Sequence, residues 1–183
     1  HDGAILLTSS EDAIAGLGGP MAVLEGYGEF FNVDLTVGAG SLVDANVSNQ
    51  TLKFNIGPDP ITNLGIMQAS RPDGATAGTP GGILELSGGT VTGTGQVIAQ
   101  QDSTVILRNV AFDGVSLLDG GGTIVDVAAS TFTNLSNRGI FEVEGEATLV
   151  GNVDNTNGLI RIKNGGAAIL SQGATKFVLE DPQ

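Results

Sequence analysis

The chain contains 183 residues, carries a formal net charge of −13 and has no cysteine. The excess of Asp and Glu repels a phosphate backbone, so we expect no nucleic acid partner. The absence of cysteine excludes thiol catalysis and a disulfide framework. Apolar runs such as Ala4–Leu7 are far shorter than the roughly 18 residues of a membrane span, so we expect no membrane insertion.

Residues 1–25 are the least regular part of the chain. Ser10–Ala15 begins with a capping serine and two acidic residues, which predicts at most a short helical turn before the break at Gly16–Pro20. We expect this segment to cap a solenoid or to exchange with another chain. The candidate for strand exchange or assembly is the short apolar run made of Ala4, Ile5, Leu6, Leu7 and Thr8.

From residue 26 onward, short runs of alternating apolar and polar residues are separated by Gly or Asn. The first clear run has Leu35 and Val37 on one side, with Asp34 and Thr36 on the other. This period of two is typical of β-strands that bury one face. Each run is too short to form a core alone, so we expect equivalent runs to stack and to join their apolar faces.

Residues 71–80 interrupt this rhythm with Pro, Gly and Thr and with no periodic apolar positions. Such turn-forming composition predicts an exposed loop inserted into one coil. The alternating pattern then resumes and continues to about Leu170. Lys176–Leu179 is a candidate last strand.

One phrase returns along the chain: a glycine, a variable residue, an apolar residue, an outward residue and a second apolar residue. It begins at Gly65, Gly95, Gly139 and Gly158. A second period-2 phrase follows several copies, and its Leu86 and Leu107 are 21 positions apart. Strands that recur at such an interval predict a stack of coils of about 20 residues.

The alternation also predicts which side chains face inward. One inner set consists of Val97, Ala99, Phe141, Val143, Ile160 and Ile162, and a second consists of Leu84, Leu86, Val105, Leu107, Leu149 and Leu170. Glu142 and Arg161 occupy the outward position of equivalent phrases. We therefore expect them to be exposed neighbours on adjacent coils.

Asparagines precede several strands, in Thr62–Gly65, Thr133–Gly139 and Asn155–Gly158. Asn tolerates the left-handed backbone conformation and bonds to neighbouring backbone groups. The residues therefore form either a ladder at one corner of the coils or a set of ordinary polar turns.

Several of these phrases, among them Phe31–Gly38, Thr62–Ser70, Gly81–Val91 and Asn157–Gly165, resemble the β-helical repeats of large bacterial surface proteins. The family is that of autotransporter passengers and filamentous-haemagglutinin-like adhesins. The resemblance implies an all-β fold, a right-handed single-stranded parallel β-helix, which we expect over residues 26–183. It also implies a secreted or cell-surface bacterial protein that serves as a stalk, surface-layer or fibre subunit, or as an adhesin for a glycan or receptor.

Parallel β-helices also carry polysaccharide lyases and hydrolases, whose sites gather carboxylates and a basic residue. Two sets of residues fit this chemistry: Asp113 and Asp119 with Arg108, and Asp126 with Glu142 and Glu144. On so acidic a chain, outward carboxylates are more simply a solvated face. We therefore expect no enzyme and no cofactor, with a carbohydrate-active enzyme as the alternative and adventitious calcium left open.

The ends of the stack bear on assembly. A β-solenoid exposes unpaired strand edges at its ends unless a cap covers them. We expect this chain to continue into further coils of a parent protein or to associate head to tail with copies of itself.

Overall fold

The computed structural model describes residues 14–17, 22–32, 34–163 and 165–171. Within these ranges the chain contains strands and turns only, so it contains no helix that could cross a membrane. The candidate exchanged strand Ala4–Thr8 and the candidate last strand Lys176–Leu179 lie outside the described residues.

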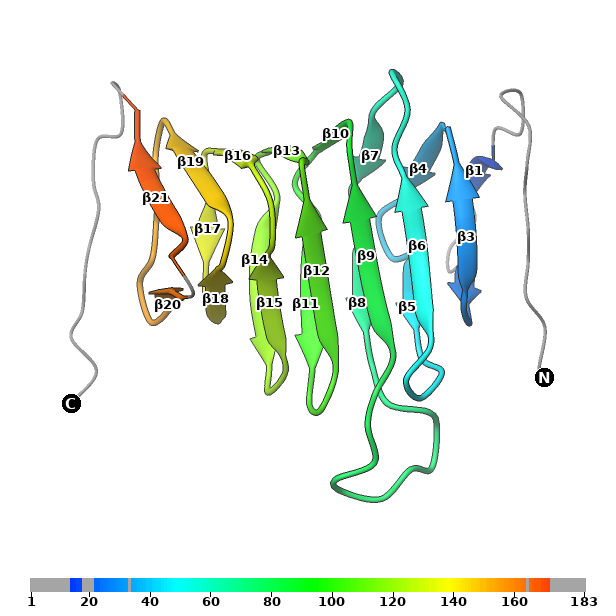
Figure 1. Cartoon of the computed structure of the whole chain (residues 1–183). Helices are drawn as coiled ribbons and strands as arrows, with labels where there is room; N and C mark the ends of the chain where they lie inside the picture. Colours follow the sequence, from blue (N-terminus) through cyan, green and yellow to red (C-terminus); the bar gives the residue numbers. More distant parts are fainter. Residues whose placement is uncertain (1–13, 18–21, 33, 164, 172–183) are drawn as a thin grey trace.

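Three parallel sheets, each named here after its first strand, form the structure (Figure 1). The β1 sheet contains β1 (Ile14–Leu17), β4 (Leu35–Val37), β7 (Ile61–Asn63), β10 (Thr90–Thr92), β13 (Ala111–Asp113), β16 (Ser130–Thr133), β19 (Glu146–Val150) and β21 (Ala167–Leu170). The β2 sheet contains β2 (Val23–Glu25), β5 (Leu42–Ala45), β8 (Ile66–Ala69), β11 (Gln96–Gln100), β14 (Ser116–Gly120) and β17 (Ser136–Asn137). The β3 sheet contains β3 (Gly28–Phe31), β6 (Thr51–Asn55), β9 (Ile83–Ser87), β12 (Thr104–Arg108), β15 (Thr123–Asp126), β18 (Ile140–Val143) and β20 (Leu159–Ile162).

The chain visits the three sheets in turn, and each strand pairs with strands of the preceding and following coils. The result is a parallel β-solenoid of about seven turns with roughly 21 residues per turn, which confirms the predicted fold class. The predicted spacings are also confirmed, because Leu86 pairs with Leu107, and Phe141 pairs with Ile160.

The recurring phrase, however, does not belong to one sheet. Its copies at Gly65 and Gly95 precede β8 and β11 of the β2 sheet, whereas those at Gly139 and Gly158 precede β18 and β20 of the β3 sheet. Grouping the copies at Gly95, Gly139 and Gly158 into one inner set was therefore wrong. The second inner set is divided too, because the β3 sheet holds Leu84, Leu86, Val105 and Leu107, whereas the β1 sheet holds Leu149 and Leu170. A glycine turn followed by a strand with one buried face can occur in any of the three sheets. The phrase therefore predicts a strand but does not predict which sheet contains it.

The inserted loop lies between β8 and β9 and projects from the end of the coil (Figure 1). Gln96 follows its register partner Ile66 by 30 positions, whereas Ser116 follows Gln96 by 20. The ten additional residues match the length of the predicted insertion. All of residues 71–80 are exposed or half-buried, as the sequence predicts.

Near the N-terminus, two strands fall within residues 1–25. β1 pairs with β4, and β2 pairs with β5, so both belong to the stacked sheets. Ile14 and Ala15, the last residues of the predicted helical turn, begin β1 instead. The remainder of that turn lies outside the described residues.

The interior consists of apolar rows that run along the stack. Predicted inward residues that are fully buried include Val97, Ala99, Phe141, Val143, Leu84, Leu86, Val105, Leu107 and Leu149. Ile160 packs against this core while partly exposed. Ile162 and Leu170 keep the predicted register with Val143 and Leu149, yet they are 52% and 51% exposed because no described strand covers the last coil.

The phrase begins with glycine because adjacent coils approach each other closely at the turns that contain Gly65 and Gly158. A Cβ atom on Gly65 would lie 2.5 Å from the carbonyl oxygens of Gly38 and Ser41, and one on Gly158 would lie 2.6 Å from Asn137 Nδ2. Neither distance leaves room for a side chain. The glycine of the phrase is therefore fixed by space between coils as well as by turn formation.

The predicted asparagine ladder forms near the C-terminal end of the β2 sheet. Asn137 Nδ2 donates to Asn155 Oδ1 at 2.6 Å, and both side chains are buried. Asn134 and Asn157 adopt positive φ angles of 55° and 61°, so they use the left-handed conformation. The asparagines thus divide the two roles, ladder and turn, between them.

Candidate functional site

The structure does not bring the first predicted carboxylate set together. Arg108 ends β12 in the β3 sheet, Asp113 ends β13 in the β1 sheet, and Asp119 belongs to β14 in the β2 sheet. The Arg108 guanidinium instead lies 3.6 Å from Glu85 Oε1. These three residues therefore form no common acid–base site.

The second set is divided between the two faces of the β3 sheet. Asp126 pairs with Val143 in an inward row and is fully buried, where its Oδ1 accepts a hydrogen bond of 2.7 Å from Ser130 Oγ. Glu142 pairs with Val125 and Arg161 in an outward row. Asp126 is thus a core residue, and the expectation of a solvated or catalytic carboxylate was wrong.

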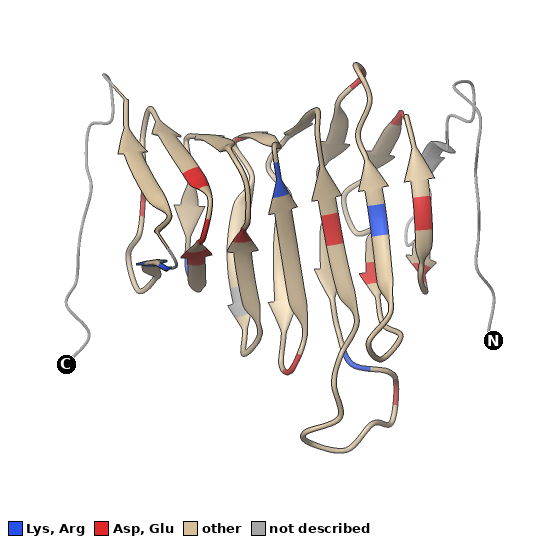
Figure 2. Ribbon diagram, in the orientation of Figure 1, with Lys and Arg blue, Asp and Glu red and all other residues tan. Residues whose placement is uncertain are grey.

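Outward charges of the β3 sheet form ladders across adjacent coils. Lys53 lies between Glu29 and Glu85, with Nζ to Oε1 distances of 3.6 Å and 3.3 Å, and acidic and basic bands alternate on β3, β6 and β9 in Figure 2. Glu142 receives Arg161 Nη1 at 2.8 Å and Lys163 Nζ at 2.6 Å. The predicted pairing of Glu142 with Arg161 is confirmed, but Glu142 is buried beneath its two partners and not exposed.

Replacing Glu142 with Gln should lower the free energy of unfolding by about 1–2 kcal/mol at neutral pH. Burial pulls the pKa of Glu142 upward, but hydrogen bonds and charges from Lys163 and Arg161 outweigh it and hold the pKa below its ordinary value. The stabilisation is therefore present above about pH 4.3 and lost as the pH falls further. Urea unfolding of the parent and the variant at several pH values above and below about 4.3 measures this stabilisation. Glu146→Gln on exposed Glu146 is the control, and equal losses in both variants would contradict the expectation.

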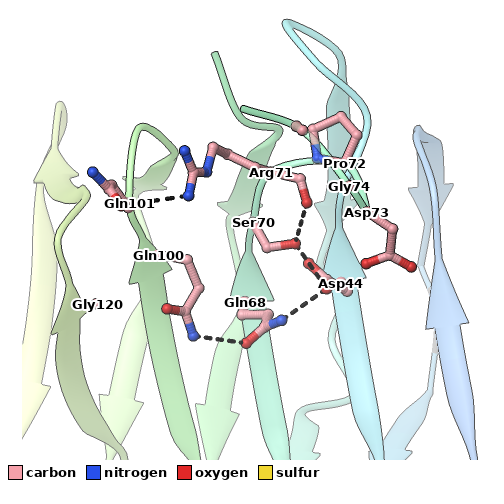
Figure 3. Close-up of a pocket in the computed structure, with 11 residues that line it drawn as sticks. Asp44, Gln68, Ser70, Arg71, Pro72, Asp73, Gly74, Gln100, Gln101 and Gly120 are labelled. Atoms are coloured by element: carbon pink, nitrogen blue, oxygen red, sulfur yellow. Dashed lines mark hydrogen bonds between the residues drawn. The ribbon is translucent and has the colours of Figure 1, made fainter. Parts of the chain in front are cut away.

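A polar groove of about 500 Å³ lies on the outer face of the β2 sheet, beside the inserted loop (Figure 3). Asp44 on β5 and Gln68 on β8 form its floor as register partners. Gln100, at the end of β11, stands over Gly120, where a Cβ atom would lie 2.2 Å from Gln100 Oε1. Arg71 and the loop form the opposite wall, and the full lining is Asp44, Gln68, Ser70, Arg71, Pro72, Asp73, Gly74, Ala75, Gln100, Gln101 and Gly120.

Hydrogen bonds orient the side chains of the floor across three coils. Gln100 Nε2 donates to Gln68 Oε1 at 3.3 Å, and Gln68 Nε2 donates to Asp44 Oδ2 at 2.7 Å. Ser70 Oγ also donates to Asp44 Oδ2, at 2.9 Å. The two amides therefore point their oxygen and nitrogen atoms in a fixed direction along the groove (Figure 3).

Asp44 has an unusual environment for a carboxylate. The residue is only 7% exposed, and its Oδ1 is buried with no hydrogen-bond partner in the described part of the chain. Burial raises the pKa of Asp44, aided by the charges of Glu25 and Asp73, while the bonds from Gln68 and Ser70 act in the opposite direction. A buried acceptor without a donor costs about 1–3 kcal/mol, so the position of Oδ1 makes the charged form of Asp44 unfavourable in the folded chain.

The loop wall is attached to the turn that follows β11. Arg71 lies 3.5 Å from Asp102 Oδ2 and donates to Gln101 Oε1 at 3.4 Å. The Gly78 amide donates to Asp102 Oδ2 at 3.2 Å. These bonds hold the loop in place as a wall of the groove, and they pair the charge of Arg71 with Asp102.

Sequence reasoning missed this groove. Asp44 and Gln68 were visible only as outward residues of separate strands, and 24 positions separate them. The one available signal was the inserted loop directly after Gln68 and Ser70, because its first residues, 71–75, line the groove.

Within the described ranges, no group of three or more His, Asp or Glu residues could hold a metal ion. Comparison of the chain with protein-family models, curated proteins and solved structures finds no match. The resemblance to bacterial surface proteins therefore rests on the sequence phrases, and the structure supports the coarser statement that the chain is a parallel β-solenoid.

Proposed function

We propose that the chain is a structural or adhesive β-solenoid of the bacterial cell exterior, serving as a stalk, surface-layer or fibre subunit. The observation that carries this proposal is the apolar end of the described stack, which no described strand covers. Ile162 and Leu170 continue inner rows to the last described coil, where half of each side chain is exposed. Large apolar side chains in such a position favour a covering coil, either from a parent protein or from a second copy.

The extracellular location is supported by the resemblance of the repeat phrases, and the net charge of −13 supports a role that does not involve nucleic acid. We further propose that the chain acts without catalysis, because the sequence-predicted carboxylate sets lie on different sheets or faces. One observation favours the alternative of a carbohydrate-active enzyme, since the groove contains two carboxyl residues, Asp44 and Asp73. Incubation with neutral and acidic polysaccharides, followed by assay of new reducing or unsaturated ends, decides between them.

Self-association of the isolated chain tests the structural proposal. Whether the natural cover is a further coil of a parent protein or a second copy, the isolated chain exposes the same apolar residues at the last described coil. Sedimentation velocity over a wide concentration range should show growing assemblies for the full chain. A double variant, Ile162→Asp with Leu170→Asp, should stay monomeric, and its exposed positions limit the cost to folding. Thr131→Asp, at a half-buried position within the stack, is the control that should assemble like the parent.

A full chain that is monomeric at every concentration would contradict this proposal, as would unimpaired assembly of the double variant. A truncated chain that lacks residues 1–9 tests the expected role of Ala4–Thr8 separately. If the truncated chain still assembles, strand exchange through Ala4–Thr8 is contradicted, whereas head-to-tail stacking is not.

A further inference from the structure

We propose that the outward charge row of the β3 sheet continues from one copy of the chain to the next, with Arg161 of one copy lying against Glu29 of its neighbour. The inference rests on the proposed function and deepens it, because it names the partner, a second copy, and the register of the junction. A wrong register and an absence of assembly have different experimental outcomes.

The charge row consists of the outward residues that occupy one register position on successive strands of the β3 sheet. Lys53 Nζ lies 3.6 Å from Glu29 Oε1 at one end of the row, and Arg161 Nη1 lies 2.8 Å from Glu142 Oε1 at the other. The row thus begins with an acid and ends with a base, so a head-to-tail stack continues the alternation of sign. From β3 to β20 its members are Glu29, Lys53, Glu85, Ile106, Val125, Glu142 and Arg161.

Both terminal residues of the row are accessible to a further partner. The side chains of Glu29 and Arg161 are 39% and 46% exposed, whereas that of Glu142, inside the row, is 9% exposed. β3 and β20 lie at opposite ends of the stack, and each has a described strand of its sheet on one side only (Figure 1). An edge strand offers backbone N–H and C=O groups to a strand of another copy. Parallel pairing of β20 with β3 of a neighbour would therefore extend the sheet in its existing pattern.

The apolar residues beside the charge row favour the same register. Ile162 and Phe30 immediately follow the two terminal charged residues, and both lie in one inward row of the β3 sheet. Ile162 is 52% exposed at the last described coil. Placing Arg161 against Glu29 sets Ile162 against Phe30, so the first coil of the neighbour covers it. A shift by one residue would pair inward with outward positions, and a shift by two would separate the charges.

The charge of the whole chain makes local complementarity important at the junction. Each copy carries a net charge of −13, and copies of like net charge repel each other. Arg161 and Lys163 place two of the seven Lys and Arg residues of the chain at the β20 edge, whereas Glu29 lies at the β3 edge. Contact between these two edges therefore sets opposite charges against each other where the copies meet.

Charge reversal at the two ends of the row tests this proposal by sedimentation velocity on the full chain. Glu29→Arg and Arg161→Glu should each weaken assembly at least about tenfold, because each sets like charges against each other at the junction. A double variant with both changes restores opposite charges and should assemble within about threefold of the parent. Asp113→Arg, at an exposed position on the β1 sheet, changes the net charge as Glu29→Arg does and is the matched control that should assemble like the parent.

A mixture of the two single variants distinguishes a changed junction from a damaged end. The unchanged β20 edge of Glu29→Arg matches the unchanged β3 edge of Arg161→Glu, and the two reversed edges match each other. Equal amounts of both should therefore form assemblies that grow beyond dimers, although neither variant does so alone. If each substitution only damaged its own edge, the mixture would stop at dimers joined through the unchanged edges. Circular dichroism confirms that each variant is folded.

Loss of assembly in both single variants, with recovery in the double variant and in the mixture, would support the proposal. Parent-like assembly of either single variant, an equal loss in Asp113→Arg, or a mixture that stops at dimers would overturn this register while leaving the proposed function in place. A parent chain that stays monomeric at every concentration would overturn the proposed function and this inference with it.

Discussion

Replacing Asp126 with Asn should stabilise the folded chain by about 3 kcal/mol above pH 7 and by almost nothing below pH 4. Asp126 lies in an inward row between Leu107 and Val143, and it is completely buried. Burial raises its pKa to about 6, although hydrogen bonds from Ser130 and the Ala128 backbone act in the opposite direction. One carboxylate oxygen, Oδ2, is buried without a hydrogen-bond partner among the described residues.

The sign follows from proton binding. Between about pH 4 and pH 6 the folded chain holds the Asp126 proton more tightly than the unfolded chain, so stability falls as the pH rises. Asn carries no titrating proton, and its amide oxygen can still accept from Ser130 Oγ. The difference between variant and parent should therefore grow across this range and then stay constant.

Urea unfolding of both proteins at several pH values between 3.5 and 8 would measure this difference. Asp113→Asn, on an exposed carboxylate, should change stability by less than about 0.5 kcal/mol throughout. A variant at Asp126 that is less stable than the parent at pH 8 would show that the buried charge has a compensating partner.

Replacing Phe132 with Ala should destabilise the chain by about 3–5 kcal/mol. Phe132 is completely buried in the middle of the stack. Its ring lies parallel to Phe112 at a centroid distance of 5.4 Å and meets Phe141 edge-on at 5.0 Å. Removing it leaves a cavity between coils, since neighbours held in the sheets cannot move to fill the space.

Phe31 offers a control for this variant, because it is 42% exposed at the end of β3. Phe31→Ala should cost less than about 1 kcal/mol. Chemical denaturation would measure the loss in free energy of unfolding for both variants, provided that the slope of this free energy against denaturant concentration is unchanged. A cost below about 1 kcal/mol for Phe132→Ala would show that the core relaxes around the cavity.

The sequence contained enough information for strands and register, but not for sheet assignment. Leu86 and Leu107 repeat in the same phrase because each apolar row must contact its equivalents, so their pairing could be predicted. The angle at each corner is set by left-handed Asn and Gly residues and by close backbone contacts. Those details decide which sheet a strand enters, and a period-2 pattern does not contain them.

The groove and the buried acid illustrate two further limits. Asp44 and Gln68 become neighbours only through the path of an entire coil, and their contact with the loop depends on its anchoring to Asp102. Asp126 is two positions after the inward-facing Ile124, so the alternation along the strand predicts that Asp126 also faces inward. Counting Asp126 among the outward carboxylates of an acidic chain was therefore wrong, although charged groups normally avoid burial.

Because each strand bonds only to its equivalents one coil away, the molecule behaves as a linear series of linked layers. Opening the outermost layer breaks contacts with one neighbour, whereas opening a central layer breaks contacts with two. Fraying should therefore begin at the last coil and advance inward, so amide hydrogen exchange should slow progressively from β20 and β21 toward β12. Attachment of another layer at that end would protect the β20 and β21 amides first, and it would raise the protection of the central amides least.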